Sequence, residues 1–364
     1  LNKTFFPTTD FSKLKDCDYI IICVPTPLKK NNSSPDVSHI KKTVDNILKI
    51  NYLNKVIILE STSWPGTTKN LIINRLNSKN LQSGKNFFVC FSPERINPGS
   101  DYKEYINTPK VIGADDKKSL YKGKYFYKKI FKHVVPASGT DVAEASKLYE
   151  NTFRSVNISF ANELKYLLKK LKIDIWEVID LSKTKPFGFM PFYPGPGIGG
   201  HCIPIDPLYL LWKFKKEKLN SKVISLTTNI NKSIPFKIVD LIKKDQKKKN
   251  ISILILGISY KKNVNDLRES AGIKIMKILK KRNIKFRFYD KFFDKINLKS
   301  NSNIENKSIK LNKKNLLNFD GVLIITDHDN VNYKYIFKYS KKIYDTKNIV
   351  GNHFKTFKNK TIKI

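Results

Sequence analysis

A cysteine at the end of a loop rich in glycine and proline is the residue of this chain best suited to covalent chemistry. Residues 192–202 read FYPGPGIGGHC, and Asp206 follows four residues after Cys202. The glycines let the backbone approach a ligand closely, and the prolines stiffen the loop. An apolar helix is expected to begin near Leu208, and a thiol near a helix start is a common setting for a nucleophile. We therefore predict Cys202 as a nucleophile.

Two other interpretations of this loop are less favoured. The string GPGIGG at 195–200 formally matches a dinucleotide-binding fingerprint. However, no hydrophobic strand precedes it, and we expect Pro204 and Pro207 to interrupt the helix that should follow. A zinc site is not expected either, because His201 and Cys202 are adjacent and no second Cys/His pair has ligand spacing. A rigid surface loop with a buried, inert cysteine remains the alternative.

The loops that must accompany this cysteine follow buried strands in the first third of the chain. Continuous apolar runs at 19–24, 56–59 and 87–91 each end in a polar loop that contains proline. A helix capped by Asp36 is expected from there to about Ile50. This alternation predicts a doubly wound parallel sheet, which binds ligands at the carboxyl ends of its strands. The chain begins with Leu1, without a Gly-rich first turn, so we expect its first Rossmann half to be missing.

The middle of the chain reads as mostly helical from 116 to about 245. Asp141 and Glu144 have capping-box spacing at the start of a long helix that reaches about Lys170. Lys147, Asn151 and Arg154 follow at positions i, i+4 and i+7, so they share one face of this helix. A solvated polar stripe is the simpler explanation of that face.

A second α/β unit is predicted after residue 250. Its strands are expected at 251–257, 286–290 and 322–326, with a helix around Ile275 to Leu279. The segment from about Ile296 to Asn315 is polar and rich in lysine and asparagine, so we expect a loose surface excursion there.

The composition limits the classes of partner. The net charge is +38, but only six of the 69 basic residues are arginine, and lysine is spread along the whole chain. A nucleic-acid binder would cluster its basic residues and use arginine. We therefore expect no nucleic-acid partner, and a positive field that favours an anionic substrate. No apolar run of transmembrane length or signal peptide is present, and four cysteines without paired spacing fit a reducing cytoplasm.

Five segments together resemble one enzyme family. The loop GPGIGGHCIPIDP at 195–207 resembles the active-site loop of the UDP-glucose/GDP-mannose dehydrogenase family. The strand-end loops VPTP (24–27), STSWPG (61–66) and SPERINPG (92–99) resemble the NAD-side, STxxPG and SPER loops of that family. Residues 257–270 match its GxxYKxxxxDxRxS signature. What the chain lacks is the family's N-terminal GxGxxG unit and the acidic ribose-binding residue after it.

The resemblance implies a fold and a division into domains. The fold is α/β, with two Rossmann-like doubly wound domains joined by a long central helix region, the first domain being incomplete at its N-terminus. Residues 1–115 would be the C-terminal part of an NAD-binding Rossmann domain. Residues 116–230 would form a central helical catalytic and dimerisation domain, with the long helix as the homodimer element. Residues 231–364 would form a UDP-binding Rossmann-like domain.

The resemblance also implies a mechanism in which NAD is used twice to oxidise the C6 alcohol of a sugar nucleotide to a carboxylate. Cys202 would form a thiohemiacetal and then a thioester, which water hydrolyses. The other catalytic residues carried over from the family are Lys147 (positive charge), Asn151 (hydrogen bond), Asp206 (ordered water), Glu94 (general base) and Thr62 (water binding). No metal is expected to take part.

The family's binding positions can be carried over in the same way. The cofactor would contact Pro25, Thr26, Thr62, Glu94 and Arg268. The substrate would contact Glu94, Arg95, Lys147, Asn151, Arg154, Tyr193, Gly195, Gly199 and Lys261.

The residues beside Cys202 and Glu94 suggest the substrate. His201 precedes the cysteine and Arg95 follows the glutamate, a pattern that resembles the UDP-N-acetylhexosamine 6-dehydrogenases within the family. We therefore expect UDP-N-acetylglucosamine, in the synthesis of surface-polysaccharide precursors. UDP-N-acetylgalactosamine and UDP-N-acetylmannosamine are close alternatives, and UDP-glucose is the next. A non-catalytic fragment that binds sugar nucleotides also remains open.

Overall fold

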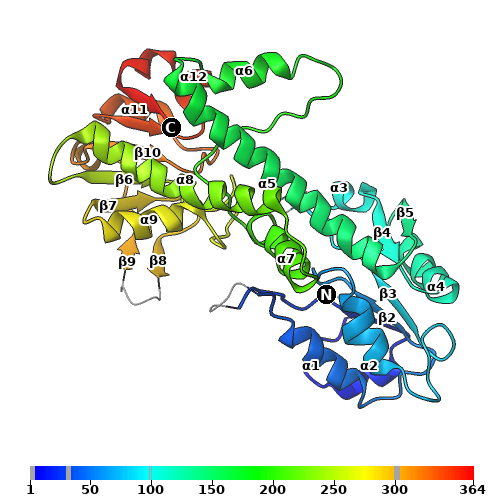
Figure 1. The fold of residues 1–364 in the computed structure, drawn as a ribbon. Coiled ribbons are helices and arrows are strands. Elements are labelled where there is room, and N and C mark those ends of the chain that lie inside the picture. Colours follow the sequence, from blue (N-terminus) through cyan, green and yellow to red (C-terminus); the bar gives the residue numbers. More distant parts are fainter. Residues whose placement is uncertain (1–4, 30–33, 98, 100, 299–303) are drawn as a thin grey trace. The chain divides into compact units, whose positions relative to one another are not determined.

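The computed structural model of the chain describes residues 5–29, 34–97, 99, 101–298 and 304–364 (Figure 1). Pro98 of the predicted SPER loop and the first residue, Leu1, lie outside these ranges. The chain divides into two compact units. Unit 1 comprises Leu1–Asn151 and Ile205–Asn220, and unit 2 comprises Thr152–Pro204 and Ser221–Ile364. The finer boundaries at 115 and 230 remain predictions.

Unit 1 is built on a five-stranded sheet with the order β1-β2-β3-β4-β5 (Figure 1). Neighbouring strands are parallel except β3 and β4, which are antiparallel. The three predicted strands are present, although the first ends two residues earlier than predicted. The strands are β1 (Tyr19–Ile22), β2 (Val56–Leu59), β3 (Phe88–Phe91), β4 (Lys110–Gly113) and β5 (Val134–Ala137).

Helices cover both faces of this sheet. Ile40, Val44 and Ile47 of α1 (Ser38–Ile47) pack against one face, and Tyr127 and Phe131 near α4 (Lys117–Lys128) pack against the other. Asp36 accepts a hydrogen bond from the Ser38 amide at 3.0 Å, but it lies one residue before the cap position, which is Val37 and makes no side-chain capping bond. The helix ends at Ile47, three residues before the predicted end. Shorter elements of unit 1 are η1 (Phe11–Asp16), η2 (Lys69–Ile73), α2 (Asn74–Leu76) and α3 (Tyr102–Asn107).

The long central helix α5 (Thr140–Lys170) confirms the predicted limits, but its start differs from a capping box. Asp115 accepts hydrogen bonds from the Thr140 amide and hydroxyl, both at 2.9 Å. The carboxylate of Glu144 instead bonds to the loop after β2. The spacing of Asp141 and Glu144 therefore does not form a capping box, because the Glu144 carboxylate accepts hydrogen bonds from a distant loop and not from the start of its own helix.

Helix α7 (Cys202–Lys216) begins at Cys202, six residues before the predicted start. The expectation that its prolines interrupt the helix is wrong. Pro204 lies in the first turn, where backbone amides have no partner within the helix and a missing N–H costs nothing. Pro207 lies inside the helix and removes one backbone hydrogen bond without ending it.

Unit 2 contains a parallel five-stranded sheet with the order β12-β11-β10-β6-β7. Helices α8 (Lys222–Gln246) and α9 (Ala271–Lys281) contribute to the core on one face, and shorter helices contribute to the core on the other. The strands are β6 (Ser252–Leu256), β7 (Lys285–Tyr289), β10 (Gly321–Ile324), β11 (Ile343–Asp345) and β12 (Thr361–Lys363). The remaining helices are α6 (Ile175–Ser182), α10 (Lys313–Leu317), α11 (Tyr333–Tyr339), α12 (Ile349–His353) and η3 (Lys355–Lys360).

The polar segment after β7 is more ordered than predicted. It forms the antiparallel pair β8 (Lys295–Leu298) and β9 (Ile304–Lys307), and residues 299–303 lie outside the described ranges. Ile296 is buried in the core of unit 2, and Ser308 bridges to Phe288 of β7. These contacts anchor a stretch that composition alone assigned to the surface. Within the described ranges, none of the helices has the length and apolar character needed to cross a membrane.

Candidate active site

The loops after β1 and β2 are tied together by Ser61. Its hydroxyl donates to the Val24 carbonyl and accepts from the Val24 amide, both at 2.8 Å. Pro25 and Thr26 follow directly, and the Thr26 carbonyl accepts a hydrogen bond from the Tyr209 hydroxyl at 2.5 Å. The predicted cofactor residues Pro25, Thr26 and Thr62 therefore lie in two loops that the Ser61 side chain joins at the carboxyl ends of neighbouring strands.

Glu94, in the loop after β3, is held by four donors. One carboxylate oxygen accepts from the amides of Arg95 and Ile96 at 2.8 Å. The other accepts from Tyr105 at 3.3 Å and from the ammonium group of Lys110 at 3.2 Å. This arrangement fixes the orientation of the predicted general base.

Lys110 is a residue that the sequence analysis missed. It is 2% exposed and forms a second ion pair with Glu60, at the end of β2, at 2.8 Å. Tyr127 donates to the same Glu60 oxygen. The Cys23 thiol donates to the other Glu60 oxygen at 3.3 Å, and burial, followed by the Glu60 charge, raises the pKa of Cys23 to about 12. Cys23 is therefore a protonated thiol at neutral pH.

The first turns of α5 reach the same loop as Lys110. The Lys147 ammonium group donates to the Glu94 carbonyl. Glu150 holds Arg95, with contacts of 2.7 Å to Nη2 and 3.3 Å to Nε, and the Pro109 carbonyl accepts from Nη1 at 2.9 Å. The structure thus brings the predicted residues Glu94, Arg95 and Lys147 together, with the Arg95 guanidinium group directed at Glu150.

Asn151 and Asp206 also meet within unit 1. The Asn151 side-chain amide donates to the Asp206 carboxylate at 2.5 Å, and the two residues are 1% and 0% exposed. Leu148 of α5 and Tyr209 of α7 pack in the same small cluster. These contacts hold the third and fourth turns of α5 against α7.

In unit 2, the loop that leads to Cys202 packs against the signature segment 257–270. The Gly200 amide donates to the Arg268 carbonyl at 2.9 Å, and Gly200 has a φ of +80°. A Cβ atom at Gly199 or Gly200 would lie 2.8 Å from side-chain atoms of Tyr260. Only glycine fits at these two positions, so Tyr260 explains the glycine pair immediately before His201 and Cys202.

Other predicted contacts in unit 2 have protein partners. The Tyr193 hydroxyl donates to Asp180 at 3.0 Å, and its ring stacks on Trp176 with centroids 5.3 Å apart. The Gly195 amide donates to Asn162 at 3.0 Å. Arg268 forms contacts of 2.7 and 2.9 Å with Asp266, which raise the pKa of the guanidinium group.

Three further residues belong to this part of unit 2. Desolvation, followed by the charge of Arg268, lowers the pKa of His201, which favours a neutral imidazole beside Cys202. Lys261 is half-buried in the signature segment, and Arg154 is exposed on α5. Cys202 itself is half-buried.

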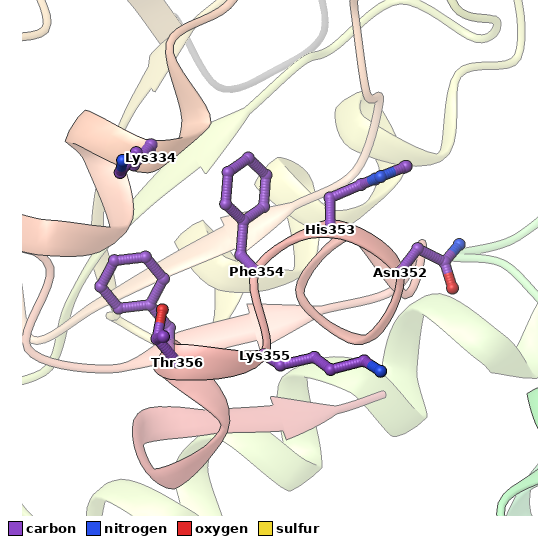
Figure 2. Close-up of a pocket in the computed structure, with 7 residues that line it drawn as sticks. Lys334, Asn352, His353, Phe354, Lys355 and Thr356 are labelled. Atoms are coloured by element: carbon purple, nitrogen blue, oxygen red, sulfur yellow. The ribbon is translucent and has the colours of Figure 1, made fainter.

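A cavity of about 470 Å³ lies elsewhere in unit 2 (Figure 2). It is lined by Lys334, Asn352, His353, Phe354, Lys355, Thr356 and Phe357. None of the predicted site residues lines it, so it is separate from the candidate active site.

The predicted catalytic residues are distributed over the two units. Glu94, Lys147, Asn151 and Asp206 belong to unit 1 with Thr62, whereas Cys202 belongs to unit 2 with the signature segment. The hydrogen bonds described above organise each group within its own unit.

Three models of one protein family match consecutive parts of the chain. The model of the NAD binding domain of the UDP-glucose/GDP-mannose dehydrogenase family matches residues 1–133. The model of its central domain matches residues 141–233, and the model of its UDP binding domain matches residues 254–352.

Curated proteins and a solved structure agree with these matches. A UDP-N-acetyl-D-mannosamine dehydrogenase of Methanococcus vannielii is 31% identical, covering 94% of this chain and 78% of that protein. One of Methanocaldococcus jannaschii is 36% identical over 77% of this chain, and the match spans slightly less than two thirds of that protein, 64%. The structure of a UDP-D-ManNAc dehydrogenase from Pyrococcus horikoshii matches with a TM-score of 0.83 and 30% identity, covering 94% of this chain and 80% of that one. The chain therefore belongs to the UDP-glucose/GDP-mannose dehydrogenase family, whose members are NAD-dependent nucleotide-sugar dehydrogenases.

Proposed function

We propose that the protein oxidises the C6 alcohol of a UDP-N-acetylhexosamine to a carboxylate in two NAD-dependent steps, for the synthesis of surface-polysaccharide precursors. The observation that carries this proposal is the position of Cys202. It is the first residue of α7 and follows Gly199 and Gly200, where only glycine leaves room for the Tyr260 side chain of the UDP-domain signature. The positive end of a helix favours a thiolate at its first turn, as a nucleophile requires.

The residues of unit 1 fit a dinucleotide cofactor. The loops after β1 and β2 lie at the carboxyl ends of parallel strands, where open α/β sheets bind nucleotides. Ser61 fixes both loops through Val24, so Pro25, Thr26 and Thr62 would hold the cofactor on a rigid edge. When bound there, NAD would accept one hydride in each oxidation step.

The catalytic roles follow from the chemistry of each side chain. Cys202 as thiolate would attack the C6 aldehyde to form a thiohemiacetal, and loss of a hydride would give a thioester that water hydrolyses. Lys147 would stabilise the developing oxyanion by its charge, with a hydrogen bond from Asn151. Glu94 would act as the general base for hydrolysis, with Thr62 and Asp206 positioning the water. Each role remains part of the proposal.

The substrate is proposed from the relatives. The proteins of M. vannielii and M. jannaschii are named for UDP-N-acetyl-D-mannosamine, which supports this epimer as the first to test. The N-acetylglucosamine expected from His201 and Arg95 is not confirmed by these relatives. UDP-N-acetylgalactosamine and UDP-glucose remain alternatives.

A homodimer through α5 is part of the proposal. Three large apolar side chains recur at a seven-residue spacing along this helix and are 41–58% exposed: Phe153, Phe160 and Leu167. Such a stripe on a long helix favours packing against a second helix of the same kind. The four cysteines are unbridged, which supports a reducing compartment, the cytoplasm, as the site of the reaction.

The decisive experiment measures NADH formed per sugar consumed, with each UDP-sugar offered separately to the whole protein. We expect two NADH per UDP-N-acetylhexosamine, and Cys202→Ser should lower acid formation by roughly 1,000-fold or more because it removes the nucleophile. Cys17→Ser, which changes an exposed cysteine of unit 1, is the control and should retain activity. Undiminished acid formation by Cys202→Ser would refute the covalent mechanism. Turnover of UDP-glucose alone would refute the substrate class.

A further inference from the structure

Glu144, on the first turns of α5, makes more hydrogen bonds to the loop after β2 than to its own helix. One carboxylate oxygen accepts from the Thr68 amide and hydroxyl, both at 2.7 Å, and from the Ser63 hydroxyl at 3.3 Å. The other accepts from the Gly66 amide at 2.6 Å. Glu144 is 0% exposed. One carboxylate therefore accepts four hydrogen bonds from residues 63–68 of this loop.

Burial and hydrogen bonding have opposite effects on the Glu144 carboxylate. Burial raises the pKa of Glu144 to about 7, although the four hydrogen bonds act in the opposite direction. A carboxylate is a costly choice for a buried position unless its donors are required there. A leucine would occupy a similar volume but would leave the Gly66 and Thr68 amides without this partner.

The loop that Glu144 holds is continuous with the proposed cofactor edge. Residues 61–68 contain Thr62, and Ser61 at its start fixes Val24 of the neighbouring loop. Three residues further along α5, Lys147 donates to the carbonyl of Glu94 in the loop after β3. Two adjacent turns of one helix thus hold the loops after β2 and β3 in a fixed register.

We propose that Glu144 is a positioning residue for the cofactor: it locks the loop Ser61–Thr68 onto α5, and so sets the backbone against which the nicotinamide dinucleotide binds. This inference rests on the proposed function. Glu144 touches the loop and not the reacting atoms, so its loss should weaken the binding of NAD much more than the binding of the UDP-sugar.

The test uses Glu144→Gln in the whole protein. The glutamine oxygen can replace the oxygen that accepts three bonds, but its NH₂ group then faces the Gly66 amide, donor against donor. We expect the KM for NAD to rise about tenfold, the value of losing one hydrogen bond to a charged group. The KM for the UDP-sugar should change less than twofold, and amide hydrogen exchange of residues 63–68 should accelerate.

Asp115→Asn is the matched control. Asp115 accepts from the Thr140 amide and hydroxyl at the start of α5 and makes no hydrogen bond with the loop 61–68 in the described part of the chain. A purely structural role for Glu144 predicts that both variants lower the melting temperature alike and leave the KM for NAD unchanged. That outcome, or unchanged exchange at 63–68 in Glu144→Gln, would overturn the proposal.

Two further measurements test the role of Glu144 if Glu144→Gln does not fold or if the wild-type protein is inactive. If Glu144→Gln does not fold, Thr68→Val removes only the hydroxyl donor and should raise the KM for NAD by a smaller factor, while a normal KM would count against the proposal. If the wild-type protein turns over none of the UDP-sugars, the proposed function fails. Direct NAD titration and hydrogen exchange of the same variants would still decide whether Glu144 positions the cofactor loop.

Discussion

Lys110 in unit 1 and Lys165 in unit 2 are both buried, at 2% and 6% exposed, but their surroundings differ. Lys110 lies between two carboxylates, 2.8 Å from Glu60 and 3.2 Å from Glu94. It also lies 5.1 Å from the centre of the Tyr127 ring. Its charge is compensated on several sides.

Lys165 has no such compensation. Its ammonium group has no hydrogen-bond partner within the described ranges, and its nearest aromatic contact is the Tyr166 ring at 4.8 Å. Desolvation, followed by the charges of Lys169 and Lys237, lowers its pKa to about 7. Burial therefore favours the neutral form of the Lys165 amine.

The two buried lysines therefore have different effects on the protein. Around Lys110, one cation joins acidic residues from the ends of β2 and β3, so its burial organises the candidate site. Around Lys165, a charge enters a core without an anion, so its burial costs stability. A count of buried lysines would not separate the two, because only the partners do.

The largest expected effect is that of Lys110→Met. It leaves Glu60 and Glu94 close together without their cation, and should destabilise unit 1 by about 2–4 kcal/mol, the lower end reflecting the partial exposure of Glu94. Turnover should fall more than tenfold because Glu94 loses its orientation. Urea unfolding and steady-state kinetics would measure both, with the exposed Lys118→Met as control. Equal stability of Lys110→Met and Lys118→Met would show that the ion pairs of Lys110 do not stabilise the protein.

Lys165→Met should change the stability in the opposite direction from Lys110→Met. Removing an uncompensated buried cation is expected to stabilise the protein by roughly 1–3 kcal/mol at pH 7, measured by urea unfolding. Lys170→Met, an exposed change one turn away on α5, should be nearly neutral. Destabilisation by Lys165→Met would mean that this ammonium group is useful where it lies.

The stability of the protein should also depend on pH because of Lys165. The pKa of Lys165 is about 7 in the folded protein and 10.5 as the ordinary value, so the unfolded chain binds more protons between these pH values. This lysine therefore makes wild-type stability rise with pH across that window. The advantage of Lys165→Met should shrink steadily from pH 7 to pH 10.5. A difference that stays constant over this range would exclude an effect of charge burial.

The smallest effect is expected at Tyr127. Tyr127→Phe removes one donor to Glu60 while Lys110 and Cys23 remain in contact with that carboxylate. The loss should be about 1 kcal/mol, measured by thermal or urea unfolding. A loss as large as that of Lys110→Met would show that the network acts as a unit and not through its cation.

Local patterns predicted the elements well. Apolar runs placed β1, β2, β3 and β6 to within about two residues, and the spacing of Asp141 and Glu144 placed the start of α5 to within one residue. The motifs also selected Glu94, Lys147, Asn151 and Asp206, which lie in hydrogen-bonded groups within unit 1. Predictions that depended on distant partners were weaker. Asp141 and Glu144 suggested a capping box, but Thr68, 76 residues away, occupies the glutamate.

The sequence by itself determined the family, the positions of the main strands along the chain and the position of the cysteine, because each depends on residues close to one another in the chain. Tertiary structure decided which of many lysines is buried between carboxylates, why Gly199 and Gly200 are required, and that α7 begins at Cys202. Lys110 and Glu60 are 50 residues apart, and Gly200 and Tyr260 are 60 apart. A hydrogen bond, an ion pair or a steric limit depends on distance in space, so these features exist only once the chain has folded.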